Sequence, residues 1–280
     1  MTKTHYGACI FCKRVGKLSK EDVVPHWIAR ELRRLHGDPR TLFIETDTND
    51  LGAMINQHQK LVGSAASLKL PVVCPNCNKK WMGNIELNAS AILRPALAGQ
   101  GITISPAQQR IVARWAALKA MLYDLRRPND HPVVLDADLK AFYAVRNPPP
   151  QFQLRLGQYK GQLKHSGFHL RATTFATQTF GELPAGEPHA ELLTVIFGEL
   201  IVHSVLVGLR GRDVPGLYQR GELDLAMVRV WPPSVGDITW PPTEAMDDQA
   251  VTALTGTPYG PVTSIGSPLP GVPRRGSTTS

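Results

Sequence analysis

The chain has 280 residues, of which 42% are apolar and 19% are charged, and its formal net charge is +8. This length and composition suit one large domain or two small ones rather than a disordered chain. There is no stretch of about 18 apolar residues and no apolar leader segment, so we expect no membrane span, no secretory signal and a cytoplasmic location.

The positive charge is concentrated in the first part of the chain. Residues 1–100 contain 14 Lys and Arg against 8 Asp and Glu, whereas residues 101–280 contain 17 against 15. A basic surface attracts polyanions, so this distribution suits a polyanion such as nucleic acid. The alternative is a solvated basic face without a ligand. The nearly neutral second part could instead bind a protein.

Residues 19–36 are the first predicted element, a loop followed by a helix. Pro25 suits the first helical turn and Gly37 suits the helix end. We interpret residues 38–70 as loop with short helical pieces.

Next along the chain, a short apolar run, residues 70–73, leads into Cys74. Residues 81–93 should form a helix that stops at Arg94 and Pro95. A domain boundary is expected near residue 100.

Two further helices are expected after that boundary. The sequence Ser105-Pro106-Ala107-Gln108 has the capping-box pattern and should start a helix that ends near Arg127. A shorter helix is predicted over residues 135–145.

Beyond residue 151 the pattern becomes that of strands. Apolar and polar residues alternate over residues 152–157 and 168–172, residues 192–209 suit a buried hairpin, and residues 223–230 suit another strand.

We therefore predict an α+β fold. It comprises a small zinc-stapled module over residues 1–100, a domain of helices and antiparallel sheet over residues 101–255, and a disordered Gly- and Pro-rich tail over residues 256–280.

The four cysteines form two C-x-x-C pairs, Cys9 with Cys12 and Cys74 with Cys77. A two-residue gap lets both thiolates of a pair face one tetrahedral ion, so the four together predict a structural Zn²⁺ site with no open coordination position. The alternatives are a redox C-x-x-C motif or unpaired buried thiols. A reducing compartment favours metal over disulfides.

Two segments next to these cysteines carry a family resemblance. They are SKEDVVPHW, residues 19–27, and VCPNCNKKWMGNIE, residues 73–86. Together they resemble the HNH endonucleases of the His-Me finger type, specifically a bacterial and phage group that has a C-x-x-C pair near the N-terminus. The resemblance covers residues 1–95. It implies a small ββα-metal module in which Mg²⁺ or Mn²⁺ assists the hydrolysis of DNA phosphodiester bonds.

The resemblance also implies site residues. Glu21, Asp22, Asn78 and Glu86 stand at the family's metal-binding and catalytic positions, but Asp22 replaces the His that usually acts as general base. A carboxylate with a pKa near 4 is a weak base at neutral pH. His26, four residues later, could supply the missing imidazole or lie on a helix surface. Asp22 could instead stabilise a helix N-terminus through the helix dipole, and Asn78 could cap the helix that follows it.

Three functions remain open from the sequence. The first is a metal-dependent DNA endonuclease with a structural zinc ion. The second is a catalytically impaired zinc-finger protein that binds nucleic acid on the same scaffold. The third is a protein-interaction module that zinc only stabilises.

Overall fold

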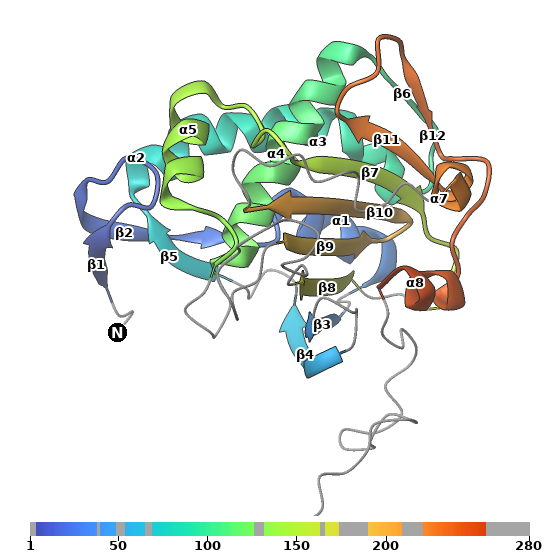
Figure 1. Cartoon of the computed structure of the whole chain (residues 1–280), viewed down its shortest axis with the longest axis horizontal. Coiled ribbons are helices and arrows are strands. Elements are labelled where there is room, and N and C mark those ends of the chain that lie inside the picture. The colour runs from blue at the N-terminus through green and yellow to red at the C-terminus, as the bar shows by residue number, and fades with distance from the viewer. Residues whose placement is uncertain are drawn as a thin grey trace, which may run out of the picture.

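A computed structural model gives the architecture and describes residues 4–37, 40–48, 54–64, 69–125, 132–162, 166–173, 190–208 and 221–255. These residues form a mixed α and β structure in which the sheets are mainly antiparallel, as the sequence predicts (Figure 1). The tail over residues 256–280, which we expect to be disordered, lies outside the described residues.

A three-stranded antiparallel sheet carries both cysteine pairs. Its strands, in spatial order, are β1 (His5–Ala8), β2 (Val15–Asp22) and β5 (Lys69–Val73). Because β2 runs antiparallel to both neighbours, the carboxyl ends of β1 and β5 lie at the same edge. One pair follows β1 and the other follows β5, so this topology brings them together.

A helical segment begins at the second cysteine pair. The short helix α2 (Pro75–Cys77) leads through a π-helical turn (Asn78–Met82) into α3 (Gly83–Leu97). The predicted stop at Arg94 and Pro95 is wrong, since α3 runs through Pro95. Pro95 cannot donate to the carbonyl of Ala91, so the helix loses one hydrogen bond, and it continues for only two more residues, to Leu97.

Helix α1 (His26–His36) follows β2 and packs one face into the core through Trp27, Ile28 and Leu32. It ends as predicted at Gly37, whose φ of 81° suits glycine and whose N–H donates to the carbonyl of Arg33 at 3.0 Å.

The large sheet has seven strands, all neighbours antiparallel except the parallel pair β3 and β8. In spatial order they are β11 (Met227–Trp231), β7 (Gln153–Gln158), β10 (Leu200–Val207), β9 (Ala190–Phe197), β8 (Ser166–Thr173), β3 (Arg40–Thr48) and β4 (Met54–Ser64). A separate two-stranded ladder joins β6 (Ile102–Ile104) to β12 (Ile238–Trp240).

The expectation of loop and short helices over residues 38–70 is therefore wrong where the structure describes them. Strands β3 and β4 pair with each other, and β3 also pairs with β8, which follows it by more than one hundred residues. These strands depend on backbone hydrogen bonds to a partner far along the chain, which the local sequence pattern could not predict.

The predicted hairpin over residues 192–209 is confirmed as β9 and β10, whose side chains are all buried. Its turn contains Gly198 at φ +60°, where a Cβ atom would lie 2.4 Å from the carbonyl oxygen of Leu97. Only glycine fits this close approach, so the turn can dock against the end of α3. The N–H of Glu199 donates to that same carbonyl at 3.1 Å.

The capping box predicts α4 (Pro106–Asp124) correctly, because the Ser105 and Gln108 side chains each accept from the other residue's N–H. Helix α4 is the central helix, in contact with α3, β10 and β11, and it is buried along most of its length. Helix α5 (Asp136–Val145) also matches its prediction. The predicted strand over residues 223–230 instead begins as helix α7 (Gly221–Ala226), and α8 (Asp248–Thr255) follows β12.

The larger of the two hydrophobic clusters among the described residues runs from Phe11, beside the first cysteine pair, to Trp240. Contacts connect the two sides of the predicted boundary at residue 100. Strands β3 and β4, from before it, join the large sheet, and α5, from after it, packs on the cysteine-bearing module. None of the helices in the described ranges combines the length and hydrophobicity needed to span a bilayer.

Candidate metal centre and adjoining acidic cluster

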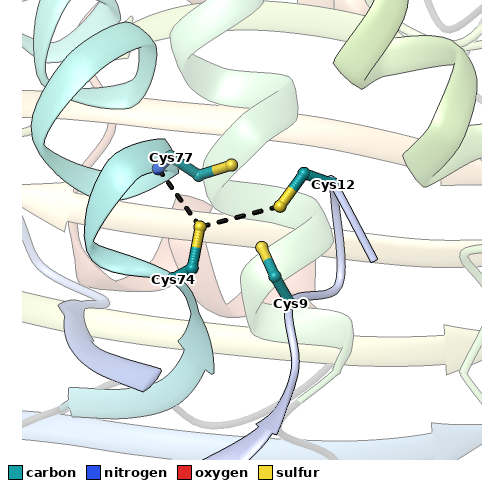
Figure 2. A group of neighbouring side chains, drawn as sticks. All are labelled: Cys9, Cys12, Cys74 and Cys77. Carbon is teal, nitrogen blue, oxygen red and sulfur yellow. Dashed lines mark hydrogen bonds between the residues drawn. The ribbon is translucent and has the colours of Figure 1, made fainter. Parts of the chain in front are cut away.

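The turn between β1 and β2 presents Cys9 and Cys12 (Figure 2). The N–H of Cys9 donates to the Arg14 carbonyl at 3.0 Å, and the N–H of Lys13 donates to the Cys9 carbonyl at 2.9 Å. Lys13 adopts a left-handed φ of 61°, which closes the turn. The N–H of Ile10 donates to the Val72 carbonyl at 3.1 Å and so joins this turn to β5.

The four sulfur atoms converge from the two turns, as Figure 2 shows, and all lie within 4.8 Å of one another. Those of Cys12 and Cys74 are 3.6 Å apart. Sulfurs about 2.3 Å from one tetrahedral ion lie about 3.8 Å from each other, so the cluster has the size of a four-thiolate metal site. In the part of the chain that the structure describes, this is the one group of three or more His, Cys, Asp or Glu close enough to hold a metal ion.

Cys9 and Cys77 are fully buried, whereas Cys12 and Cys74 are half-buried. The Cys74 sulfur accepts the N–H of Cys77 at 3.4 Å. Burial raises the pKa of Cys9, but nearby backbone N–H groups outweigh burial and lower this pKa to about 7. Burial raises the pKa of Cys77. Metal binding requires all four thiols as thiolates, so the donor set suits a soft or borderline cation.

Helix α5 covers this centre with an aromatic layer. The Phe11 ring meets Trp81 edge-on at 5.0 Å and Phe142 at 6.3 Å. The guanidinium of Arg146 lies 4.1 Å from the Trp81 ring centre and 4.5 Å from that of Tyr143. Arg146 also interacts electrostatically with Cys77. Four thiolates and one divalent ion carry a net charge of −2, so this cation offsets part of the excess negative charge.

An acidic cluster lies elsewhere in the module, at the end of β2. Glu21 is buried, and its Oε1 accepts a hydrogen bond from Lys119 Nζ of α4 at 2.9 Å. The same ammonium forms an ion pair with Glu86 of α3 and donates to the main-chain carbonyl of Asp22 at 2.9 Å. The ammonium thus donates hydrogen bonds to Glu21 and to the Asp22 carbonyl, and it forms an ion pair with Glu86.

Lys119 is only 4% exposed, so it is a buried cation between two carboxylates. Burial opposes its charge, but Glu21 and Glu86 outweigh burial and raise its pKa, which keeps it an ammonium. Burial raises the pKa of Glu21, and Lys119 opposes that rise. The cluster therefore joins β2, α3 and α4 through one shared positive charge.

Among the predicted site residues, Glu21 and Glu86 lie on the same ammonium of Lys119, whereas the others have different surroundings. The carboxylate of Asp22 forms an ion pair with Lys69 at 2.5 Å. Asn78 donates to the Ser19 hydroxyl at 3.1 Å, and this hydroxyl donates to the Val73 carbonyl, so Asn78 ties the helix start to β2 and β5. His26 is exposed at the first position of α1.

Lys119 is the functional residue that sequence reasoning missed. It lies next to Leu118 and four residues after Trp115, on the face of α4 that the apolar pattern assigns to the core. A lysine at such a position is rarely buried without a partner, so its placement was the available signal for a buried acid.

We expect one zinc ion per chain by metal analysis, and we expect chelation to destabilise the protein strongly, because thiolate-bound zinc contributes about 10 kcal/mol or more to the folding of small metal modules. Protons compete with the metal below the pKa of Cys9, so release should be faster at pH about 6 than at about 8. The zinc-loaded chelator is the control. A metal-free chain with the same unfolding midpoint would contradict this expectation.

Replacing Lys119 with Met should lower the free energy of unfolding by about 3–5 kcal/mol, because Glu21 and Glu86 would lose their cation. Lys140→Met, which removes an exposed partner of Asp136, should cost less than about 1 kcal/mol. The triple variant Glu21→Leu, Lys119→Met, Glu86→Leu should recover most of the loss. Urea denaturation measures the free energy of unfolding of all three variants. Equal stability of the two single variants would show that the buried ion cluster contributes no more than an exposed ion pair.

Replacing Arg146 with Met should weaken metal binding by roughly tenfold, since residues that support a metal centre from outside typically contribute this much. Arg146→Lys keeps the charge but loses the planar stacking on Trp81 and Tyr143, so its loss should be smaller. Arg110→Met, on an exposed residue of α4, serves as the control. Competition with a coloured chelator gives the affinities, and an Arg146→Met value equal to the control would refute the proposed electrostatic support.

No protein-family model, curated protein or solved structure matches this chain. The likeness to HNH endonucleases therefore rests on the two sequence segments around the cysteine pairs.

Proposed function

We propose that this protein is a zinc-stabilised nucleic-acid-binding protein on an HNH-like scaffold, in which the ammonium of Lys119 takes the place of a catalytic cation. The observation that carries the proposal is the position of Lys119 Nζ, which contacts Glu21 and Glu86 together. Glu21, near the end of β2, and Glu86, on α3, are two of the acids that the resemblance singles out.

The electrostatics of the acidic cluster support this proposal. Glu21 and Glu86 supply two negative charges, and Lys119 already offsets one of them in a buried space. A divalent cation drawn to the same carboxylates would meet a fixed positive charge at close range, where low local polarity strengthens repulsion. Asp22, which would complete a set of three carboxylates, pairs with Lys69.

The charge distribution supports nucleic acid as the ligand. Residues 1–100 contain 14 Lys and Arg against 8 Asp and Glu, whereas residues 101–280 contain 17 against 15. The excess includes Lys79 and Lys80, which are exposed just after the second cysteine pair. Such a basic module beside a nearly neutral remainder suits a polyanion that contacts the basic module.

The metal in this proposal is a structural Zn²⁺ ion held by Cys9, Cys12, Cys74 and Cys77. Four thiolates leave no open position for water or substrate, which favours a role in stability over a role in chemistry. The ion would fix the turn after β1 against the start of α2, and thereby the basic side chains that these elements carry.

A Mg²⁺- or Mn²⁺-dependent endonuclease is the second candidate, and the convergence of Glu21 and Glu86 favours it. In that case Lys119 would position the two carboxylates, and His26 or Asp22 would have to activate the attacking water. The exposed position of His26 and the ion pair of Asp22 with Lys69 favour the binding protein over this candidate.

The two candidates differ in a plasmid-nicking and gel-shift experiment on the full chain. We expect DNA binding that weakens as salt rises, without nicking in Mg²⁺ or Mn²⁺. Replacing Lys79 and Lys80 with Gln should weaken binding and reduce the salt slope by up to roughly 0.9 per charge removed, whereas Lys140→Gln should have little effect. Lys140 is the control because it is exposed on α5 and paired with Asp136.

Metal-dependent nicking that Glu21→Gln abolishes and Lys140→Gln preserves would establish the endonuclease instead. If the chain shows neither nicking nor salt-dependent DNA binding, both candidates fail and the protein-interaction module remains. Because Glu21→Gln keeps the shape of the side chain, its folding can be verified by its unfolding midpoint before activity is compared.

A further inference from the structure

One face of the β1–β2 hairpin exposes apolar side chains beside positive charge. Tyr6 is opposite Lys17 and Ala8 is opposite Val15 in the antiparallel register, so these four side chains lie on the same face. Tyr6 is 75% exposed and Val15 is 83% exposed. Strand β1 is also the edge of its three-stranded sheet. Tyr6 and Val15 together leave apolar surface uncovered on this edge strand, beside the charge of Lys17.

The charge around this face selects among possible occupants. The described residues 4–20 contain Lys13, Arg14, Lys17 and Lys20 and no acidic residue. Lys13 pairs with Asp136, and no ion pair is recorded for the other three cations among the described residues. A second copy of this chain would bring like charges together at this edge, whereas a polyanion would find complementary charge.

We propose that the hairpin face formed by Tyr6, Ala8, Val15 and Lys17 binds single-stranded nucleic acid. The Tyr6 ring stacks on an unpaired base, Val15 extends the apolar surface under it, and Lys17 contacts the adjacent phosphate. A base inside a duplex is covered by its neighbours, so the ring can contribute fully only when the bases are unstacked. This inference rests on the nucleic-acid-binding function proposed above and specifies the substrate class.

The metal centre would hold this face in one shape. The turn that follows β1 carries Cys9 and Cys12, and the Cys9 N–H is bonded to the Arg14 carbonyl, so both strands of the hairpin are fixed next to the metal. A rigid hairpin loses little conformational entropy on binding, which favours affinity from a small surface.

Fluorescence anisotropy with labelled oligonucleotides tests the proposal. The probes are a single strand of thymidines and a mixed-sequence duplex of the same length, titrated with the full chain. Tyr6→Ala should weaken single-strand binding by about fivefold or more and leave duplex binding nearly unchanged, since one base–aromatic stack contributes about 1–3 kcal/mol. Tyr6→Phe should bind like the parent. Lys17→Gln should weaken both and reduce the salt slope.

Leu87→Ala is the matched control, because Leu87 is 67% exposed on α3 and lies outside the hairpin. If the parent binds oligonucleotides but Tyr6→Ala and Leu87→Ala behave alike, the hairpin inference is wrong and the proposed function stands. If the parent binds no oligonucleotide, both fail together. Binding to vesicles that contain phosphatidylserine, in the absence of oligonucleotide binding, would also overturn the inference in favour of a membrane surface.

Discussion

The ion pairs of the buried Lys119 ammonium fix helix α4 against the cysteine-bearing module. The ammonium comes from α4, the helix that covers the large sheet, and it contacts β2 and α3 of the cysteine-bearing module. A buried charge shared by two carboxylates and a backbone carbonyl fixes position more narrowly than apolar packing, because any displacement leaves a carboxylate without its partner. The same contact explains why Glu21 and Glu86 can approach one another without a divalent ion.

The metal centre is linked to the second part of the chain in a similar way, but through aromatic packing. Helix α5 contributes Phe142, Tyr143 and Arg146 to the layer over the cysteines, and Lys13 reaches out from the first turn to Asp136. Residues beyond position 100 therefore shield both the acidic cluster and the metal centre. The module over residues 1–100 should be regarded as one face of a continuous core rather than as an independent finger.

Sequence patterns predicted the elements that local chemistry determines. The two C-x-x-C pairs, the capping box at Ser105 and the apolar hairpin around Gly198 each carry their signal within a few residues. The patterns failed for β3 and β4, whose partner β8 is far along the chain, and for Lys119, whose acidic partners lie on two other elements. The resemblance supplied the candidate site residues, but their ion pairs depend on tertiary contacts. Asp22 is the example, since Lys69 comes beside it only when β2 and β5 pair.

The position of β3 and β4 has a consequence for how the molecule folds. The chain between Cys12 and Cys74 is a closed loop whenever the metal is bound, and that loop must reach the far edge of the large sheet, where β3 pairs with β8. Contacts between such distant residues slow folding, because the chain entropy is lost before the pairing is gained. Early metal capture would shorten this search by bringing both ends of the loop to one place. A metal ion held by the four cysteines would therefore affect the order of events during folding as well as the final stability.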